Sequence, residues 1–352
     1  MAAVLQSPRI LELEERPIPT PGPGEILLRI EANTLCGTDG RIFTGEKTAL
    51  VRPGVVPGHE FGGRIAAIGE SVTGFTVGRQ ATVSIVLSCG HCFECLDNRE
   101  HLCENLELFG YGVDGGLQEY CLVPARAVAR GNVIQTNGEL PPKALALAEP
   151  VSCCLHGLNQ YQVHLGDTVV ILGAGPIGLI HTQLAKAAGA KNIIVTNRSP
   201  HRREIALSIG ATHAIDPASK SLEQTVKDLT NGRGADAAVV CIGVPELADT
   251  ALNLVRNGGR VNFFAGFPKN STSIMEPNII HYKELTVTGG SNATRKDVQK
   301  AVELLQAGAI NADAIVTHTF PLSEVHKAYE AMMNRVGVKI AVIPDALFSN
   351  TP

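Results

Sequence analysis

An apolar run that leads into three spaced glycines is the strongest constraint in this sequence. Residues 169–172 read Val-Val-Ile-Leu, and Gly173, Gly175 and Gly178 follow in the pattern G-x-G-x-x-G. In a strand–turn–helix unit the first glycine permits the tight turn. The second lets the backbone approach a pyrophosphate, and the third lets helix and strand pack closely. The anion then lies at the helix N-terminus. The predicted dinucleotide-binding residues of this loop are Gly173, Gly175, Pro176, Ile177 and Gly178.

The residues about 20 positions beyond the glycines indicate which dinucleotide is bound. An NAD enzyme presents Asp or Glu there to the ribose 2′-hydroxyl, whereas this chain has Asn197 followed by Arg198. The amide removes repulsion against a 2′-phosphate, and Arg198, with Arg202 or Arg203, can bind it through charge-assisted hydrogen bonds. The alternative is that these arginines only face solvent. We predict NADP(H) in preference to NAD(H).

Strand-like and helix-like segments alternate after residue 166. This alternation predicts an α/β fold with a doubly wound parallel sheet covered on both faces. The expected strands are residues 168–172, 192–196, 237–241, 260–264 and 285–288, and the expected helices are residues 176–188, 200–207, 245–255 and 295–307.

The segment before residue 150 is different in character. Short β-branched runs, such as residues 25–30 and 81–86, are separated by Gly and Pro, which predicts a β-rich domain. Residues 338–343 return to strand character and are expected to pair back into that first domain. Because 352 residues exceed what one hydrophobic core usually organises, we predict two domains: residues 1–150 with 290–352, and residues 151–289.

The overall charge excludes some partners. Thirty basic against 34 acidic residues give a net charge of −4, which offers no field for a polyphosphate backbone. The start of the chain lacks a basic segment followed by an apolar run, and no stretch approaches the ~20 apolar residues needed to cross a bilayer. We expect a soluble cytoplasmic protein that binds neither nucleic acid nor a membrane.

Four of the nine cysteines are clustered in the pattern C-x2-C-x2-C-x7-C, at Cys89, Cys92, Cys95 and Cys103. Four thiolates satisfy tetrahedral zinc and leave no open coordination position, so the predicted site is structural. An iron–sulfur cluster and uncoordinated thiols are the alternatives. This clustering is typical of a reducing compartment, where such thiols bind metal instead of forming disulfides.

A second set of metal-ligand residue types is dispersed along the chain: Cys36, His59, Glu60 and Glu149. A thiolate, an imidazole and one or two carboxylates can hold zinc and leave one position for water or substrate, which is the catalytic arrangement. Each residue also has a structural explanation. Cys36 can be a buried thiol, His59 a core histidine, and Glu149 a helix cap before proline. Their joint occurrence favours the metal site.

These three features, in this order, resemble the zinc-containing medium-chain alcohol dehydrogenase family. The resemblance covers essentially the whole chain. It is most specific at Gly58-His-Glu-x-x-Gly63, followed by Gly69 and Val72, and at the four-cysteine segment. Cys36-Gly-Thr-Asp39 with Ala148-Glu-Pro150 is most similar to the sorbitol and threonine dehydrogenase branch. The resemblance implies a GroES-like catalytic domain, a Rossmann domain, and one catalytic and one structural Zn²⁺ per chain.

The resemblance also implies roles for individual residues. Cys36, His59 and Glu60 are expected as zinc ligands, and Glu149 as a ligand or a hydrogen-bond partner of the zinc-bound water. Thr38 resembles the hydroxyl through which the substrate proton leaves, with a small turn hydroxyl as the alternative. The expected catalytic residues are therefore Thr38, Glu60 and Glu149.

Two positions depart from the family pattern. The histidine that commonly passes the proton onward, five residues after the first zinc cysteine, is Arg41 here, and arginine cannot serve as a base near pH 7. The proton then leaves through the ribose and water, or Arg41 binds an acidic substrate. The second departure is Asn197, which argues against the branch's usual NAD. The residues expected near the substrate are Arg41, Phe43, Ser291 and Asn292.

The expected function is oxidation of a secondary alcohol, or reduction of the corresponding ketone, by hydride transfer with NAD(P)(H). A polyol or sugar alcohol is the first expectation for the substrate. A hydroxy-amino acid or another secondary alcohol is the alternative, and a non-catalytic nucleotide-binding protein is the remaining one. By the same resemblance we expect a homodimer or homotetramer.

Overall fold

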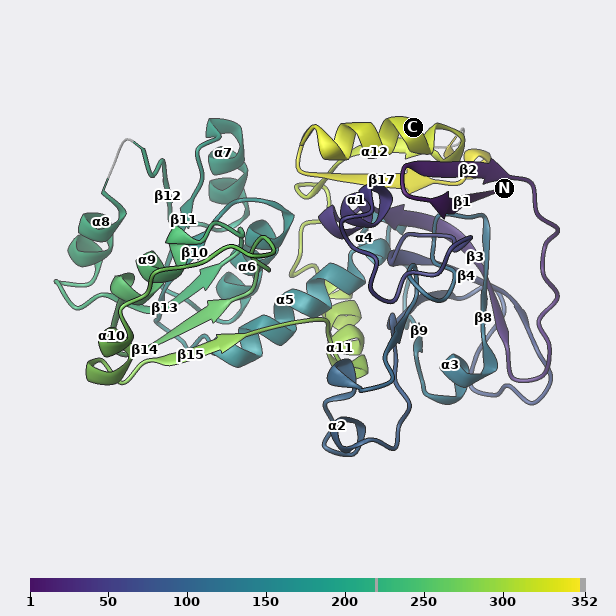
Figure 1. Ribbon diagram of the computed structural model, residues 1–352, viewed down its shortest axis with the longest axis horizontal. Coiled ribbons are helices and arrows are strands. Elements are labelled where there is room, and N and C mark those ends of the chain that lie inside the picture. Colours follow the sequence, from purple (N-terminus) through teal and green to yellow (C-terminus); the bar gives the residue numbers. More distant parts are fainter. Residues whose placement is uncertain (219–220, 349–352) are drawn as a thin grey trace. The chain divides into compact units, whose positions relative to one another are not determined.

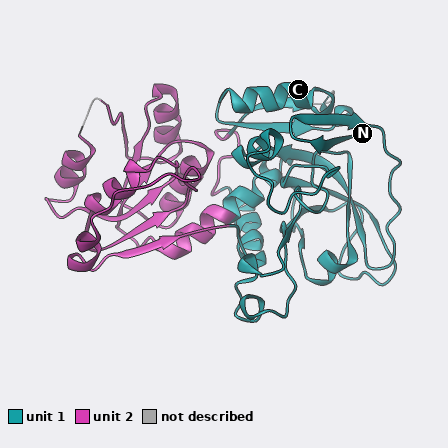
Figure 2. Ribbon diagram, in the orientation of Figure 1, with its two compact units in different colours: residues 1–152, 292–308, 316–352 teal, residues 153–291, 309–315 magenta. Residues whose placement is uncertain are grey.

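The computed structural model describes residues 1–218 and 221–348, which divide into two compact units (Figures 1 and 2). Unit 1 comprises residues 1–152, 292–308 and 316–352, and unit 2 comprises residues 153–291 and 309–315. Residues 309–315, which we expected in the catalytic domain, therefore pack with unit 2. Within the described residues, no helix is long and apolar enough to span a membrane.

Unit 1 is built on a seven-stranded sheet in the order β16-β17-β3-β4-β5-β9, with β8 also paired to β3. Its strands are β3 (Ile26–Thr34), β4 (Glu60–Ile68), β5 (Gln80–Val83), β8 (Tyr120–Val123), β9 (Val133–Gln135), β16 (Val316–Pro321) and β17 (Lys339–Ile343). Two small sheets join β1 (Ala2–Ser7) to β2 (Ile10–Glu14), and β6 (Val86–Leu87) to β7 (Glu107–Leu108).

The centre of this sheet is the antiparallel pair β3 and β4. The alternate residues Ile26, Leu28 and Ile30 of β3 bury their side chains in the core of unit 1. Gly63 allows the two strands to approach, because a Cβ there would lie 2.0 Å from the Arg29 carbonyl oxygen. β17 pairs antiparallel with β3. The expected return of the C-terminal strand to the first domain is therefore confirmed.

Short helices surround the unit 1 sheet. They are α1 (Gly37–Thr44), α2 (Phe93–Leu96), α3 (Ala125–Ala129), α4 (Pro142–Ala146), α11 (Arg295–Gln306), α12 (Val325–Met333) and α13 (Asp345–Phe348), with the 3-10 turns η1 (Glu100–Leu102) and η2 (Leu322–Glu324).

Unit 2 is a six-stranded parallel sheet in the order β12-β11-β10-β13-β14-β15. Its strands are β10 (Thr168–Leu172), β11 (Asn192–Thr196), β12 (His213–Ile215), β13 (Ala235–Val240), β14 (Val255–Phe263) and β15 (Thr286–Gly289). Its helices are α6 (Pro176–Ala187), α7 (Pro200–Ile209), α8 (Leu222–Leu229), α9 (Glu246–Leu254) and α10 (Pro277–Tyr282), and α5 (Ala148–Tyr161) begins in unit 1 and continues into unit 2.

The order of these strands is that of a Rossmann-type sheet, as expected. All five residues of β10 are buried, as they must be in a sheet covered on both faces. β13 and β14 each begin earlier than the sequence predicts, at Ala235 and Val255.

Candidate active site

Three metal-ligand side chains lie together at one end of the antiparallel β3–β4 pair. Cys36 is the N-cap of α1, directly after β3, while His59 and Glu60 lie at the start of β4. The register pairs Glu60 with Thr34, so the end of one strand lies beside the start of the other. One ligand atom from each of the three residues lies within 4.8 Å of the others. A thiolate, an imidazole and a carboxylate at this spacing fit zinc with an open coordination position.

Asp39 holds this arrangement, and the sequence analysis missed it. Its carboxylate accepts a hydrogen bond from the Cys36 backbone N–H at 2.8 Å and lies 3.1 Å from His59 Nδ1. The carboxylate at Nδ1 leaves Nε2 as the nitrogen available to a metal. Burial alone would lower the pKa of His59, but the Asp39 charge raises it well above its usual value. The capping-box position, three residues after the N-cap, is the signal that could have identified Asp39.

The Glu60 carboxylate is held by a buried cation from the C-terminal strand. Lys339 Nζ lies 2.9 Å from Oε1 and 2.6 Å from Oε2 of Glu60, and it also donates to the Leu35 carbonyl at 3.2 Å. Thr34 Oγ1 donates a further hydrogen bond to the carboxylate. Burial by itself would lower the pKa of Lys339, but Glu60 raises it above the usual value. No local motif links Lys339 to Glu60, so only the strand pairing reveals it.

The proposed proton acceptor lies on α1 beside the metal ligands. Thr38 is half-buried in the first turn, and its Oγ1 accepts a hydrogen bond from Arg41 Nη2 at 3.0 Å. Arg41, expected near the substrate, is therefore in contact with Thr38. The Tyr111 ring lies 5.5 Å, centroid to centroid, from the His59 ring.

Glu149 is buried in the first turn of α5. Among the described residues it is not part of the group of donors that lie within 4.8 Å. Its charge nevertheless acts on Tyr111 and Lys339, which contact His59 and Glu60 respectively. Glu149 is therefore near the centre without joining its closest set of ligands.

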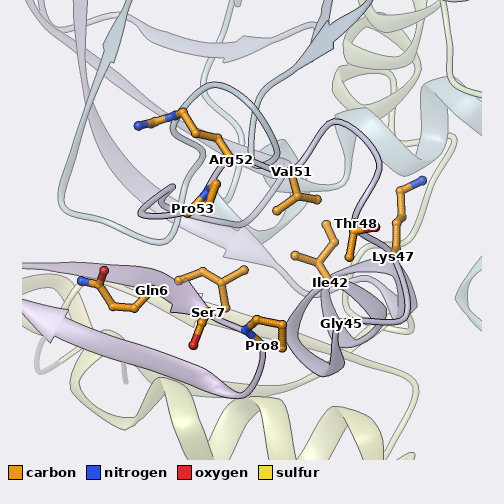
Figure 3. Close-up of a pocket in the computed structure, with 11 residues that line it drawn as sticks. Gln6, Ser7, Pro8, Ile42, Gly45, Lys47, Thr48, Val51, Arg52 and Pro53 are labelled. Carbon is orange, nitrogen blue, oxygen red and sulfur yellow. The ribbon is translucent and has the colours of Figure 1, made fainter.

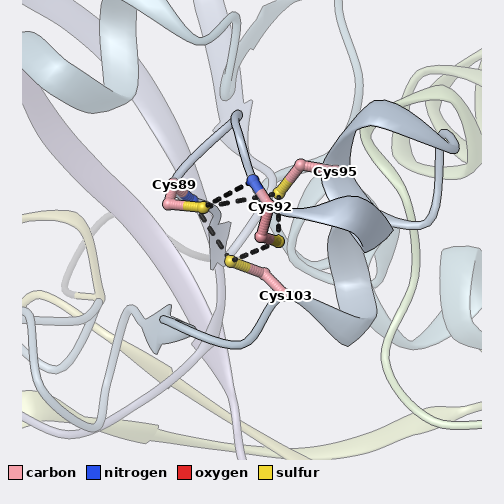
Figure 4. Close-up of side chains that lie close together, drawn as sticks. All are labelled: Cys89, Cys92, Cys95 and Cys103. Carbon is pink, nitrogen blue, oxygen red and sulfur yellow. Dashed lines mark hydrogen bonds between the residues drawn. The ribbon is translucent and has the colours of Figure 1, made fainter.

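The four clustered cysteines converge in the loop that contains α2 (Figure 4). Their Sγ–Sγ distances include 3.5 Å between Cys92 and Cys95 and 3.9 Å between Cys92 and Cys103. Four thiolates around tetrahedral zinc lie roughly 3.8 Å apart, so the spacing fits the metal. Backbone N–H groups, first that of His91 and then that of Cys92, lower the pKa of the Cys89 thiol to about 6, whereas burial raises the pKa of the Cys103 thiol to about 12.

The glycine loop has the geometry of an anion-binding turn. Gly173 has φ +115°, and Gly175 is the N-cap of α6 with Pro176 at its first position. A Cβ on Gly178 would lie 1.8 Å from the Gly173 carbonyl oxygen, so only glycine fits there. Ile177 follows in the first turn, where free backbone N–H groups can meet a pyrophosphate.

The residues after β11 lie together, although not all as predicted. Asn197 Oδ1 accepts a hydrogen bond from the Ser199 N–H at 2.9 Å. The Arg203 guanidinium donates to the Asn197 carbonyl at 2.6 Å and lies 3.1 Å from Asp216 Oδ2. Arg203 is thus already paired, which leaves exposed Arg198 as the better placed cation. The Arg202 backbone N–H donates to Ser199 Oγ, which caps the start of α7.

The other residues expected near the substrate are placed differently. Phe43 packs against Tyr329, with ring centroids 5.3 Å apart, and contributes to the core of unit 1. A role for the half-buried Phe43 ring at a substrate site stays a prediction. Ser291 is exposed at the end of unit 2, and Asn292 has φ +57° where the chain re-enters unit 1.

Comparisons with known proteins agree with this architecture. The family models for an alcohol dehydrogenase GroES-like domain and a zinc-binding dehydrogenase match residues 22–133 and 176–307. An L-threonine 3-dehydrogenase from Pyrococcus furiosus is 35% identical over 325 residues, which is 91% of each chain.

Solved structures of similar proteins extend over nearly the whole chain. A protein described as a zinc-binding dehydrogenase from Sinorhizobium meliloti, bound to NADP, has 33% identity and a TM-score of 0.91, covering 97% of this chain and 98% of that one. An alcohol dehydrogenase from E. coli, complexed with NADH, has 28% identity and a TM-score of 0.87 at the same coverage. The 2R,3R-butanediol dehydrogenase from Bacillus subtilis has 26% identity and a TM-score of 0.88, covering 98% and 99%. The chain therefore belongs to the zinc-binding medium-chain alcohol dehydrogenase family, as a zinc-dependent, NAD(P)-linked dehydrogenase that acts on CH–OH donors.

Proposed function

We propose that this dehydrogenase oxidises the secondary alcohol of a small hydroxy-amino acid, of the type represented by threonine, or reduces the corresponding ketone. The main support for this class of reaction is the metal-ligand set: one ligand atom from each of Cys36, His59 and Glu60 lies within 4.8 Å of the others. The observation that favours this substrate is the 35% identity to an L-threonine 3-dehydrogenase over 91% of both chains.

A polyol or diol is the second candidate substrate. The similarity to 2R,3R-butanediol dehydrogenase, a solved structure of the same fold, favours it. A diol and a hydroxy-amino acid both present a secondary hydroxyl next to a polar carbon substituent. They differ in charged groups, because the hydroxy-amino acid carries an ammonium and a carboxylate and the diol carries neither.

Each residue at the proposed metal site has a separate role in the reaction. Cys36, His59 and Glu60 would hold the catalytic zinc, with Glu149 as a further ligand or a partner of the bound water. When bound, the metal supplies Lewis acidity at the substrate oxygen and the nicotinamide accepts the hydride. Asp39 keeps the His59 imidazole oriented through its contact with Nδ1.

Thr38 Oγ1 would take the proton from the substrate hydroxyl. Arg41 donates a hydrogen bond to this oxygen at 3.0 Å, and a guanidinium there stabilises negative charge that develops on it. Because Arg41 stays protonated, it does not pass the proton onward. The proton would leave through the nicotinamide ribose and water.

We propose NADP(H) as the preferred cofactor. Asn197 stands where a carboxylate would repel a 2′-phosphate, and exposed Arg198 follows it. The relatives bind either form, since one solved structure is bound to NADP and another is complexed with NADH. Changing Asn197→Asp should shift the ratio of kcat/KM from NADP⁺ toward NAD⁺ by about 10-fold or more. The carboxylate repels the 2′-phosphate of NADP⁺ and accepts a hydrogen bond from the ribose 2′-hydroxyl of NAD⁺. An unchanged ratio would show that other residues select the cofactor.

We propose that the chain assembles into a homodimer or homotetramer. β15 is an edge strand of the six-stranded sheet, with one side unpaired within the described chain. Such an edge offers hydrogen-bonding groups to a second copy. Light scattering coupled to size-exclusion chromatography measures the mass directly, and a monomer at micromolar concentration would exclude the proposal.

A substrate and cofactor screen tests the main proposal. Purified enzyme with its zinc content measured per chain is mixed with L-threonine, 2,3-butanediol, sorbitol and 2-propanol, each with NAD⁺ and NADP⁺. Nicotinamide absorbance reports turnover. We expect turnover with L-threonine or a close hydroxy-amino acid. Faster turnover of the diol or sorbitol would favour the second candidate, and none with any substrate would exclude both.

A further inference from the structure

Two cationic side chains lie beside the metal-site residues and form no ion pair within the described part of the chain. Arg41 contacts Thr38 through the hydrogen bond at 3.0 Å. Lys47 Nζ lies 5.4 Å from the centroid of the Tyr111 ring, and the His59 ring packs against the same tyrosine at 5.5 Å. One aromatic ring thus contacts both the Lys47 ammonium and a metal ligand.

The turn after α1 brings the backbone of Lys47 against that of Arg41. Gly45 ends the helix with φ +82°, and the Lys47 N–H donates to the Arg41 carbonyl at 3.0 Å. Burial, and then the positive charge of Arg41, lower the pKa of Lys47, while Cys36 acts in the opposite direction. The Lys47 ammonium therefore interacts electrostatically with both the Arg41 guanidinium and the Cys36 thiol.

The nearby cavity does not supply a partner for this ammonium. A cavity of about 250 Å³ lies between β1 and the turn after α1, and Lys47 and Ile42 are among the residues that line it. Figure 3 shows the ammonium nitrogen pointing away from Ile42 and Pro8, on the far side of the cavity from β1. The stem of Lys47 borders the cavity, whereas its charge lies on the side of Tyr111.

A bound metal would not neutralise these cations. The negative charges of Cys36, Glu60 and the buried Glu149 together offset a divalent ion and the Lys339 ammonium, which is paired with Glu60. The Asp39 carboxylate is engaged with Cys36 and His59. Arg41 and Lys47 are left as two positive charges, one of them partly buried, beside the residues that would hold the metal. Partly desolvated cations favour an anionic ligand.

We propose that Arg41 and Lys47 form an anion subsite, and that the preferred substrate is a secondary alcohol that carries a carboxylate or a phosphate group. This inference rests on the proposed function, and it selects hydroxy acids, hydroxy-amino acids and polyol phosphates over neutral diols and polyols. Lys47 is a specificity-determining residue in this proposal, because it would bind the anionic end of the substrate while the hydroxyl lies at the metal.

Matched substrate pairs test the subsite. 3-Hydroxybutyrate and 2,3-butanediol are both four-carbon secondary alcohols, but only the first is anionic; sorbitol 6-phosphate and sorbitol differ by the phosphate. In the wild-type enzyme we expect kcat/KM to favour the anionic member of at least one pair by about 10-fold or more, since one charge-assisted hydrogen bond contributes about that factor. Preference within the first pair identifies a carboxylate, and preference within the second a phosphate.

The variant Lys47→Met retains the stem of the side chain and removes its charge. We expect it to reduce the anionic-to-neutral ratio of kcat/KM by about 10-fold, and Lys47→Arg to keep the ratio within about threefold of wild type. Lys191→Met, at an exposed lysine of unit 2, serves as the matched control and should leave the ratio unchanged. Equal use of both members by the wild type, or a ratio unaffected by Lys47→Met, would overturn the proposal.

A binding measurement separates failure of the subsite from failure of the proposed function. Isothermal titration of the zinc-loaded protein with 3-hydroxybutyrate or sorbitol 6-phosphate, without nicotinamide cofactor, reports binding without turnover. A Kd that rises about 10-fold in Lys47→Met supports the subsite even if no substrate of the panel is oxidised. If neither anion binds the wild-type protein, or if each anion binds Lys47→Met as tightly as it binds the wild type, the subsite is excluded even when turnover is observed.

Discussion

The Asp39 carboxylate caps helix α1 and also contacts a residue that would hold the metal. One oxygen caps α1 through the Cys36 N–H, and the other contacts His59 Nδ1. We expect Asp39→Asn to weaken zinc binding at the catalytic centre by about 10- to 100-fold, because the amide supports the imidazole less strongly than the carboxylate. Competition with a chromophoric chelator measures the affinity.

The control for Asp39 is Asp297→Asn. Asp297 has the same place in the capping box of α11, which contains no metal ligand. The variant Asp297→Asn should leave the zinc affinity of the catalytic centre unchanged. An equal loss of affinity in both variants would mean that weakened helix capping, and not the contact with His59, is responsible.

Lys339 and Glu60 form an ion pair that is almost completely buried, with exposures of 3% and 1% for the two side chains. Removing one partner leaves a buried charge without compensation. We therefore expect Lys339→Met to lower the free energy of unfolding of the zinc-free protein by about 3–5 kcal/mol. Urea denaturation measures the change. The double variant Lys339→Met with Glu60→Gln should lose less than Lys339→Met alone; an equal or larger loss would show that the uncompensated Glu60 charge is not the cause.

At the scale of elements, the four-cysteine loop has little secondary structure of its own. α2 and η1 are single turns, and neither N-cap side chain makes a capping hydrogen bond. We expect Cys95→Ser to lose one zinc per chain and to expose the loop to trypsin at Arg99, because the thiolates supply the missing internal support. Zinc analysis and limited proteolysis give the two readouts.

Cys36→Ser is the matched comparison for Cys95→Ser. It should also lose one zinc per chain, but with loss of turnover and without cleavage at Arg99. If both variants lost turnover and became sensitive to trypsin alike, the two cysteines would not belong to separate sites.

The predicted elements of unit 2 agree closely with the structure, and those of unit 1 less so. β10 and β11 have the predicted bounds, because each is a short apolar run that a glycine or a polar residue ends. The start of α5 was indicated only by Glu149 as a helix cap before Pro150, whereas its extent and its passage across the boundary between the units were not predicted. β16 and α12 were missed. Their stability depends on pairing and packing with distant segments, and local pattern carries little of that information.

At the scale of the whole molecule, the core of unit 2 contains a histidine that links its stability to pH. His181 is fully buried, and burial lowers its pKa to about 3. Its Nδ1 lies 3.0 Å from the Tyr161 hydroxyl, and its ring packs edge-on against Phe264 at 4.8 Å. The neutral imidazole is therefore the form that the folded state accommodates.

The sign of this effect follows from the unfolded chain, where histidine has a pKa of about 6.5. Above that value neither state is protonated and the full stability is present. As pH falls from 6.5 toward 3, the unfolded state gains a proton and stability is lost, by about 2 kcal/mol at pH 5. We expect His181→Gln to remove this part of the pH dependence in urea titrations at pH 7.5 and pH 5. His201→Gln, at an exposed histidine, should retain it; identical pH profiles for wild type and His181→Gln would contradict the prediction.

Residue types and their spacing were enough to predict the fold class, the family and most of the ligand types. G-x-G-x-x-G is local, as is the cysteine spacing, and each needs only its own segment to be interpreted. The glycines determine the turn because they lack a side chain that would clash with the backbone. The cysteines determine the metal site because their spacing matches tetrahedral coordination. Both effects can be predicted from residue type and spacing.

The side chains that support the catalytic centre, and the charges around it, could be identified only from the folded chain. The contact of Asp39 with His59, the pairing of Lys339 with Glu60 and the approach of Lys47 to Tyr111 all join segments that the chain order separates. Electrostatic energy depends on distance in space, and strand register sets that distance here. For that reason the ligands could be predicted from their motifs, whereas the partners that tune them became visible only in the folded chain.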